Sequence, residues 1–204
     1  MPEIREVLDF WFAPETKAGW FEPSPELDMT VRRRFGELYA RAATGQLKEW
    51  RNSSGGCLAL CLLLDQMARM IFRGDARAFA TDDRALAVAE HALAHGFDRR
   101  LPQEQRQFLY LPFMHSENLA DQLRCLALFE ATRLSTARGY AREHLEIIRR
   151  FGRFPHRNRV LGRTATPDEA AWLEANPETY GQQAASMVKA ALPAPPPDHG
   201  DAPK

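Results

Sequence analysis

The chain contains one long apolar stretch, CLALCLLLDQMARMIF at residues 57–72, from which its fold class can be worked out. Apolar side chains occur on every face, without the alternation typical of a strand, so we expect a buried helix at the centre of the protein. The few polar residues of this helix are therefore informative. Asp65, Arg69 and the following Arg73 are spaced four apart, which places them on one stripe of the helix.

Capping residues and apolar spacing predict further helices on both sides of this stretch. Ser24-Pro25-Glu26 is typical of a helix start, and Thr166-Pro167-Asp168-Glu169 is a capping box. The expected helices cover residues 3–12, 24–45, 57–72, 76–95, 116–134, 136–150 and 166–175, and one begins at Pro102 with a kink or break expected at Pro112. No sustained strand pattern occurs, so we predict an all-α fold of about seven to nine helices in antiparallel pairs.

The composition is that of an ordinary folded protein, with 204 residues of which 45% are hydrophobic and 26% charged. This length favours a single helical domain, which we place at residues 1–176. Residues 177–204 are rich in proline after Leu192 and cannot bury much apolar surface. We therefore expect them to form a flexible tail.

Charge and cysteine content limit the partners and the compartment. The formal net charge is zero, which argues against general binding to nucleic acid or to acidic lipid. The three cysteines are an odd, sparse set, and the start of the chain lacks the pattern of a secretory signal, so we expect reduced thiols in the cytoplasm. No stretch reaches the roughly 18 uninterrupted apolar residues of a membrane span, so we expect no membrane association.

A second stretch, FGRFPHRNRVLGR at residues 151–163, points to a functional site. Gly152 and Gly162 allow backbone angles that other residues rarely adopt, and Pro155 fixes one angle, so we expect an irregular segment. No acidic residue occurs from Ile147 to Pro167. The side chains that offer hydrogen-bond donors in this segment are Arg153, His156, Arg157, Asn158, Arg159 and Arg163.

Three phrases of the sequence together resemble a known family. They are Leu63-Leu64-Asp65-Gln66 followed by Ile71-Phe72-Arg73-Gly74, then Leu111-Pro112-Phe113-Met114-His115-Ser116-Glu117, and finally Phe151 to Asn158 with Leu161-Gly162-Arg163. Over roughly residues 4–175 the chain resembles the bacterial family called domain of unknown function 924. The resemblance implies a right-handed helical array similar to tetratricopeptide-repeat proteins, and it brings no established activity. Met67-Ala68-Arg69-Met70 stands where the family has Phe-Pro-Arg-Asn, which implies a less kinked helix.

The 151–163 segment has two interpretations that can coexist. In the first, its arginines, histidine and amide form a receptor for an anion or a carboxylate. The ligand-binding residues in that interpretation are Arg69, Arg73, His144, Arg153, His156, Arg157, Asn158 and Arg163. In the second, the arginines form a buried network that ties the last helices to Asp65, Glu117 and Asp121. His144 itself, among apolar neighbours, is typical of a hydrogen-bonded core residue.

His115, Glu117, Asp121 and His156 are the candidates for catalysis. Glu117 and Asp121 are four apart and would share a helix face, where with a histidine they could act as acid and base or bind a metal. The same carboxylates are also what a set of arginines needs for neutralisation, so we assign no metal site. The sequence contains no Gly-rich phosphate loop, nucleophile elbow or dinucleotide fingerprint, so we expect no cofactor.

These observations lead to three functional hypotheses. The first is a binding module that takes an acidic small molecule or a peptide carboxylate in a groove lined by arginine and histidine. The alternative is a hydrolase or lyase that uses a histidine and a carboxylate as an acid–base pair, with or without a metal. RNA binding comes third, because Phe151 and Phe154 alternate with arginines but the chain has no net positive charge.

Overall fold

The structure is a computed structural model that describes residues 1–20 and 22–176. All regular secondary structure in these residues is helical. The α-helices are α1 Pro2–Trp11, α2 Pro14–Lys17, α3 Pro25–Ala43, α4 Ser54–Cys61, α5 Ala68–Ile71, α6 Asp82–Ala94, α7 Gln103–His115, α8 Leu119–Glu130, α9 Ser135–Phe151 and α10 Pro167–Ala175. A π-helical segment, Leu62–Met67, joins α4 to α5, and short 3-10 turns form at Lys48–Asn52, Ala76–Phe79, Asp98–Arg100 and Pro155–Arg157.

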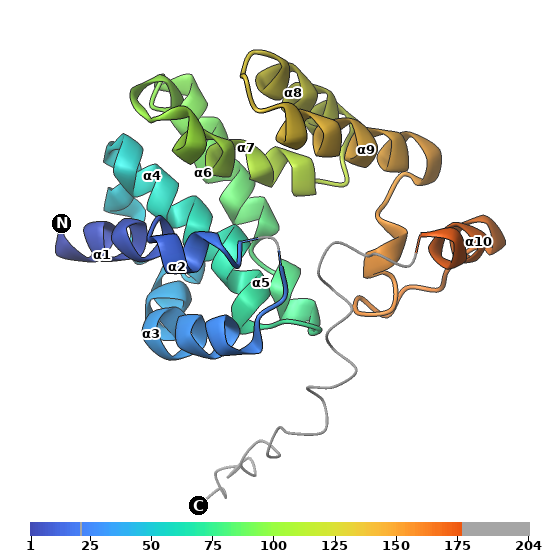
Figure 1. Ribbon diagram of the computed structural model, residues 1–204, viewed down its shortest axis with the longest axis horizontal. Coiled ribbons are helices and arrows are strands. Elements are labelled where there is room, and N and C mark those ends of the chain that lie inside the picture. The colour runs from blue at the N-terminus through green and yellow to red at the C-terminus, as the bar shows by residue number, and fades with distance from the viewer. Residues whose placement is uncertain (21, 177–204) are drawn as a thin grey trace, which may run out of the picture.

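The prediction of an all-α fold is confirmed for the described residues. We call α4, the π-helical segment and α5 together the central rod, because they form one continuous helical element over residues 54–71. With the central rod taken as one helix, the described residues contain nine α-helical elements, within the expected range. Figure 1 shows the rod in the middle of the fold, between α3 on one side and the successive helices α6 to α9 on the other.

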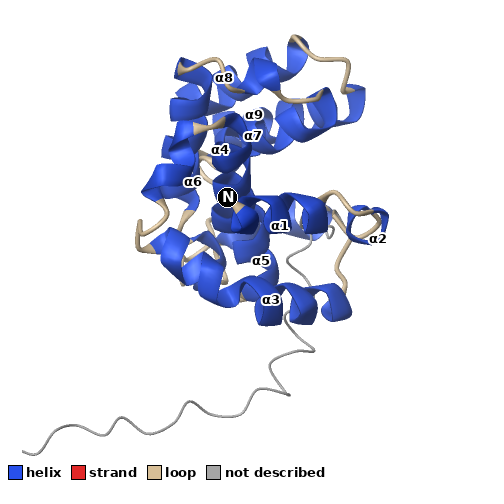
Figure 2. Ribbon diagram, turned by 90° about the vertical axis from the view of Figure 1, so that its left-hand side faces the viewer, coloured by secondary structure: helices blue, strands red, loops and turns tan. Residues whose placement is uncertain are grey.

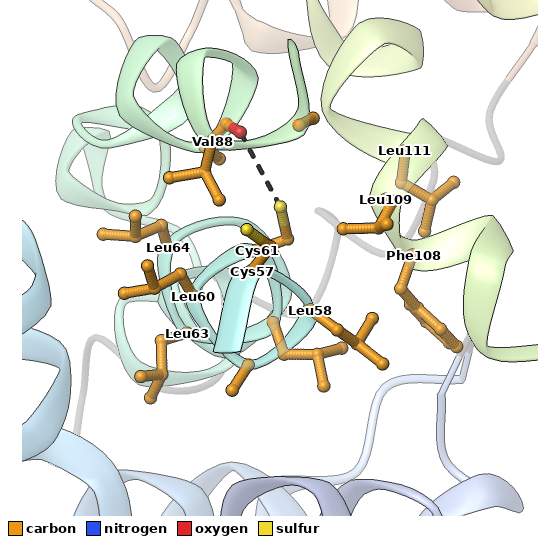
Figure 3. Close-up of a cluster of buried hydrophobic side chains, with 14 of the residues drawn as sticks. Cys57, Leu58, Leu60, Cys61, Leu63, Leu64, Val88, Phe108, Leu109 and Leu111 are labelled. Atoms are coloured by element: carbon orange, nitrogen blue, oxygen red, sulfur yellow. Dashed lines mark hydrogen bonds between the residues drawn. The ribbon is translucent and has the colours of Figure 1, made fainter. Parts of the chain in front are cut away.

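The central rod is the core of the protein, as its apolar sequence predicts. Its residues from Cys57 to Ala68 are all buried. Figure 3 shows Leu58 of the rod on the side of Phe108 and Leu109 of α7, with Cys61 below Val88 of α6 and Leu60, Leu63 and Leu64 on the opposite side of the rod. The rod is long and apolar enough to cross a membrane by length and composition alone, but 83% of it is buried inside the fold. Such burial is typical of a core helix.

The π-helical segment, Leu62–Met67, is a feature that the sequence pattern did not predict. A π turn contains one more residue than an α turn. Thr81 contacts the segment from outside the rod: its buried hydroxyl donates to the carbonyl of Leu64 at 2.6 Å. The segment also contains Asp65, which is completely buried.

Consecutive helices contact one another along the chain. α6 contacts α7, α7 contacts α8, and α8 contacts α9, while α3 lies against α5 and the π-helical segment. Figure 2 shows α7, α8 and α9 above the rod and α3 below it. A right-handed array like that of tetratricopeptide-repeat proteins stays a prediction.

The helix starts agree largely with the expected capping. Ser24 caps α3 by accepting from the backbone N–H of Leu27, and Thr166 and Glu169 form the capping box of α10. One expectation was wrong: the helix expected from residue 116 begins later, at Leu119, and Asn118 caps it. Helix α7 runs through Pro112, so the break considered there does not form, although the proline removes one backbone donor.

The chain turns after α9 into the irregular segment that the sequence predicted. Gly152 ends α9 in the left-handed conformation with a φ of 69°, and Gly162 has a φ of 65°. A small second hydrophobic cluster forms here from Ile147, Ile148 and Phe154, with Phe151 and Trp172 against it. Figure 1 shows α10 beyond this segment, at the edge of the fold. The predicted tail, residues 177–204, lies outside the described residues.

Candidate functional site

Asp65 is the centre of a charged cluster inside the fold. Its carboxylate accepts a hydrogen bond from Nδ1 of His115 at 2.7 Å and another from the amide of Gln66. Burial alone would raise the pKa of Asp65, but the charge of Arg69 and the hydrogen bond from His115 outweigh it, so the pKa lies well below its usual range. Asp65 is therefore ionised at neutral pH.

His115 lies at the C-terminal end of α7, and this carboxylate determines which tautomer its imidazole adopts. Burial lowers the pKa of His115 below its ordinary value, although the charge of Asp65 opposes the effect. The imidazole is thus neutral at neutral pH, and its one proton lies on Nδ1, because only a donor can face an ionised carboxylate at 2.7 Å. The other nitrogen, Nε2, has no hydrogen-bond partner among the described residues and is not enclosed.

Arg69 connects Asp65 to the start of α6. Its Nη1 donates to the backbone carbonyl of Asp65 at 2.7 Å and lies 3.0 Å from the carboxylate. The same guanidinium makes two parallel hydrogen bonds of 3.0 Å to the carboxylate of Asp82. Bidentate pairs of this kind fix geometry as well as charge. Asp82, which the sequence analysis did not single out, therefore belongs to the cluster.

Arg157 reaches the cluster from the 151–163 segment. Its Nη1 lies 3.3 Å from Asp82, and its guanidinium carbon lies 4.7 Å from the ring centre of Phe79 and 4.6 Å from that of Phe154. Only 7% of the side chain is exposed. Burial lowers the pKa of Arg157 to about 10, so it remains charged at neutral pH.

A pocket of about 290 Å³ opens beside these groups. Its polar lining includes His115, Ser116, Asp82 and Arg157. Its apolar lining comes from the side chains of Ala76, Phe79, Ala80, Leu86, Pro112 and Leu161. A larger depression of about 580 Å³ lies along α1 and Arg34, but it contains none of the buried charges described above.

Two further histidines lie close to His115. His144 of α9 has its ring centre 6.5 Å from that of His115, and its Nδ1 lies 2.8 Å from the carbonyl of Tyr140. Burial lowers the pKa of His144 to about 3, and the pKa of His156 also to about 3. Both rings pack against Phe154. The interpretation of His144 as a hydrogen-bonded core residue fits this geometry.

The other arginines of the 151–163 segment are bound to carboxylates. Arg163 makes two hydrogen bonds to Glu117, at 2.7 and 3.0 Å, and the backbone N–H of Phe154 donates to the same carboxylate at 2.8 Å. These bonds tie the segment to the end of α7. The pKa of Glu117, which burial alone would raise, is lowered because the hydrogen bond from Arg163 stabilises its charged form.

Glu169 of α10 holds the other side of the segment. Arg153 donates to it twice, at 2.6 and 2.8 Å, and Asn158 donates at 3.1 Å. The hydrogen bond from Arg153 lowers the pKa of Glu169 to about 2. The structure therefore assigns Arg153, Asn158 and Arg163 to the interpretation of the segment as a structural network, whereas Arg157 alone of its arginines lines the pocket.

Several predicted groupings are not formed. Arg73 pairs with Asp28 of α3 at 2.5 Å, away from the pocket. Asp121 accepts from the hydroxyl of Ser116 at 2.7 Å, so the partner of His115 is neither Asp121 nor Glu117 but Asp65. The metal alternative for His115, Glu117 and Asp121 loses its basis. The described residues contain no group of three or more histidine, cysteine, aspartate or glutamate side chains that could hold a metal.

Comparisons with known proteins agree with the helical fold and with the resemblance. Residues 7–177 match the model of a family described as bacterial proteins of unknown function, DUF924. The chain belongs to the DUF924 family. The chain is also similar to a solved structure, that of a protein of unknown function from Agrobacterium tumefaciens. The two are 38% identical with a TM-score of 0.80, and the match covers 85% of this chain and 98% of that one. No curated protein matches this DUF924 chain.

The residues that the sequence analysis missed in this DUF924 protein are Asp82, Phe79 and, as a partner of His115, Asp65. Asp82 lies at the start of α6, where an acidic residue is expected for its effect on the helix dipole alone. Asp65 and His115 are 50 positions apart, and no local spacing connects them. The phrases that carry the family resemblance contain both residues, which was the one signal available.

Proposed function

We propose that this protein is an enzyme that uses His115 as a general base and acid on a small molecule bound in the pocket beside Arg157. The observation that carries this proposal is the 2.7 Å hydrogen bond from Nδ1 of His115 to the buried carboxylate of Asp65, with Nε2 left open. A carboxylate that orients a neutral imidazole in this way prepares the opposite nitrogen to accept a proton.

The alternative of a pure binding module is less well supported. That hypothesis needs several arginines to be available to a ligand, but Arg153 and Arg163 are each held by two hydrogen bonds to a carboxylate. A binding protein also has no need for a neutral imidazole fixed in one tautomer. The acid–base hypothesis gives a role to both partners of the Asp65–His115 pair.

The chemistry of the pair follows from its charges. When Nε2 takes a proton, the imidazole becomes cationic, and Asp65 lies in place to stabilise the new charge at 2.7 Å. Arg69 lies close enough to disfavour this cation, while Asp82, which is paired with Arg69, favours it. The proton can then be returned to a leaving group, which is the second half of acid–base catalysis.

The reaction class is hydrolysis or elimination. Ser116 lines the pocket, but its hydroxyl donates to Asp121 at 2.7 Å and is not paired with His115, so it is not an activated nucleophile. The group that loses its proton to Nε2 is then either a water molecule or the substrate itself. The first case describes a hydrolase and the second a lyase.

The free, buried cysteines fit our placement of the protein in the cytoplasm.

The proposal can be tested without knowing the substrate. Nitrogen-15 NMR of histidine-labelled protein at pH 7.5 reports which imidazole nitrogen of His115 carries the proton. We expect the Nδ1–H tautomer in the unchanged protein and a mixture in Asp65→Asn, where the amide can face either nitrogen. An Nε2–H tautomer in the unchanged protein contradicts the proposal, because no basic nitrogen would then face the pocket.

A second test uses turnover. Esters, amides, phosphate esters and β-hydroxy acids are incubated with the unchanged protein and with His115→Asn. Any activity that belongs to this site should fall by about 100- to 10,000-fold in His115→Asn, the usual contribution of a general base. Activity that survives this substitution does not come from His115.

A further inference from the structure

Arg157 has more hydrogen-bond donors than the protein satisfies. A guanidinium carries five N–H groups. The described residues provide one acceptor, Asp82 at 3.3 Å from Nη1, and that carboxylate is already held by two shorter bonds to Arg69. Nε is enclosed with no hydrogen-bond partner. Nη2 has no acceptor among the described residues and is not enclosed.

The guanidinium cannot turn to find acceptors elsewhere. It lies between the rings of Phe79 and Phe154, at 4.7 and 4.6 Å, and 93% of the side chain is removed from solvent. The little of Arg157 that is exposed belongs to the lining of the pocket. A buried charge held in one position with unused donors is costly unless a partner supplies acceptors.

The acidic residues around the pocket do not supply the acceptors that the Arg157 guanidinium lacks. Glu117 lines the pocket but is bound at both oxygens by Arg163. Asp82 has to balance two arginines, Arg69 and Arg157. Asp83 also belongs to the lining, but it is exposed at the start of α6, where water screens its charge. The buried end of the pocket is therefore short of negative charge at Arg157.

We propose that Arg157 binds an anionic group of the substrate, a carboxylate or a phosphate, whose oxygen accepts a hydrogen bond from Nη2. This inference rests on the proposed function, because it names the class of molecule on which His115 acts. The anionic group anchors the molecule at one polar end of the pocket, and the proton to be moved lies toward Nε2 of His115. At about 290 Å³ the pocket is at the small end of ligand sites, which favours a small metabolite over a peptide.

The test is a binding measurement with simple anions. Sodium malonate and inorganic phosphate are titrated calorimetrically at constant ionic strength, with sodium chloride and the neutral amide malonamide as controls. We expect saturable binding of at least one anion, and the comparison of malonate with phosphate shows which group the pocket takes. If neither anion binds saturably, or malonamide binds as well as malonate, the proposal is overturned.

Two substitutions locate the anion. Arg157→Met should weaken binding by about tenfold or more, the loss expected for a charged hydrogen bond in a dry site. Arg159→Met makes the same change two positions away on an exposed side chain and should alter binding by less than about twofold if screened charge alone is lost. Equal losses in both variants would mean that general electrostatic attraction, and not Arg157, binds the anion.

A third substitution decides the question if Arg157→Met does not fold. Ala80 lies at the exposed rim of the pocket, and Ala80→Trp fills the pocket while leaving every charged residue in place. We expect this variant to keep the melting temperature of the unchanged protein and to lose anion binding. Unchanged anion binding in Ala80→Trp places the anion outside the pocket and refutes the proposal.

The failure of this inference can be told apart from the failure of the proposed function. Absence of anion binding together with the Nδ1–H tautomer removes the substrate class and leaves the base in place. Anion binding together with the Nε2–H tautomer removes the base and leaves Arg157 as the anchor of a binding site.

Discussion

At the scale of single residues, Asp65 decides the state of its neighbours. It is completely buried and yet ionised, and its carboxylate contacts both His115 and Arg69. His115 is fixed in one tautomer, and Arg69 extends the charge pattern to Asp82. The carboxylate of Asp65 thus fixes which nitrogen of His115 carries the proton, and it also holds Arg69 in place to pair with Asp82. Removing it leaves a buried cation short of a partner, a change that typically costs several kcal/mol.

A first prediction concerns Thr81, whose hydroxyl satisfies a carbonyl of the π-helical segment at 2.6 Å. Thr81→Val keeps the shape of the side chain but removes the donor of this buried hydrogen bond. We expect the free energy of unfolding in urea to fall by about 1–3 kcal/mol. Thr44→Val is the matched control, because the hydroxyl of Thr44 bonds an exposed carbonyl at 2.9 Å and its loss should change stability by less than about 0.5 kcal/mol. Equal losses in the two variants contradict the prediction.

At the scale of elements, the chain after α9 is held on by carboxylates more than by apolar area. Its hydrophobic cluster has only three buried members. Glu117 ties the segment to α7, and Glu169 ties it to α10 and closes the capping box of that helix. Arg157 enters the interior between these two ties. The position of the proposed anion anchor therefore depends on two ion pairs in which Arg157 itself takes no part.

A second prediction follows for Glu169. Glu169→Ala removes the acceptor of Arg153, Asn158 and the N-terminal N–H of the capping box. We expect hydrogen exchange in residues 164–176 to become at least about tenfold faster, while exchange in the central rod stays unchanged, because the elements open independently. Asp168→Asn, a neighbouring exposed acid, serves as the control. Slower or unchanged exchange in α10 of Glu169→Ala would show that apolar contacts hold the helix.

Most of the longer helices could be predicted from local sequence, but the short α2 and the π-helical segment were not. Ser24 and Thr166 marked helix starts correctly, and the apolar run after Ser54 marked the core. The π-helical segment could not be found in this way, because it lies in a run where every face is apolar and the period carries no information. Local sequence also allowed a break at Pro112, but α7 runs through this proline although it removes one backbone donor.

At the scale of the whole molecule, the charged cluster joins parts of the chain that are far apart in sequence. Asp65 comes from the rod, Asp82 from α6, His115 from α7 and Arg157 from the segment after α9. The segment's donors could be predicted from composition, since no acidic residue lies near them. Their partners could not, because Asp82 and Arg157 are 75 positions apart and only the packing of four elements brings them together.

A third prediction concerns the stability of the whole fold below neutral pH. The pKa values of His144 and His156 are lowered to about 3, so the unfolded chain, with ordinary histidines near 6.5, takes up protons first as the pH falls. Stability is thus complete above pH 6.5 and is lost toward pH 3. Each of these histidines should cost about 2 kcal/mol between pH 8 and pH 5.

The variant His144→Asn isolates one of these contributions. Asparagine can donate to the carbonyl of Tyr140 but does not titrate. Its free energy of unfolding should fall by about 2 kcal/mol less than that of the unchanged protein between pH 8 and pH 5. The lowered pKa values of Asp65, Glu117 and Glu169 act only below about pH 4.5, so they do not affect this comparison. An identical pH dependence in both proteins would contradict the prediction.

The surplus residue in the π-helical segment has a consequence for relatives of this chain. A π turn is an α turn with one residue inserted, so a relative that lacks this residue keeps the same apolar faces on either side. Such a relative would retain the architecture and its core, but the residue in place of Asp65 would no longer be aimed at the histidine. Counting positions between the equivalents of Ser54 and Ile71 would then separate homologues that keep a carboxylate beside the histidine from those that keep only the scaffold.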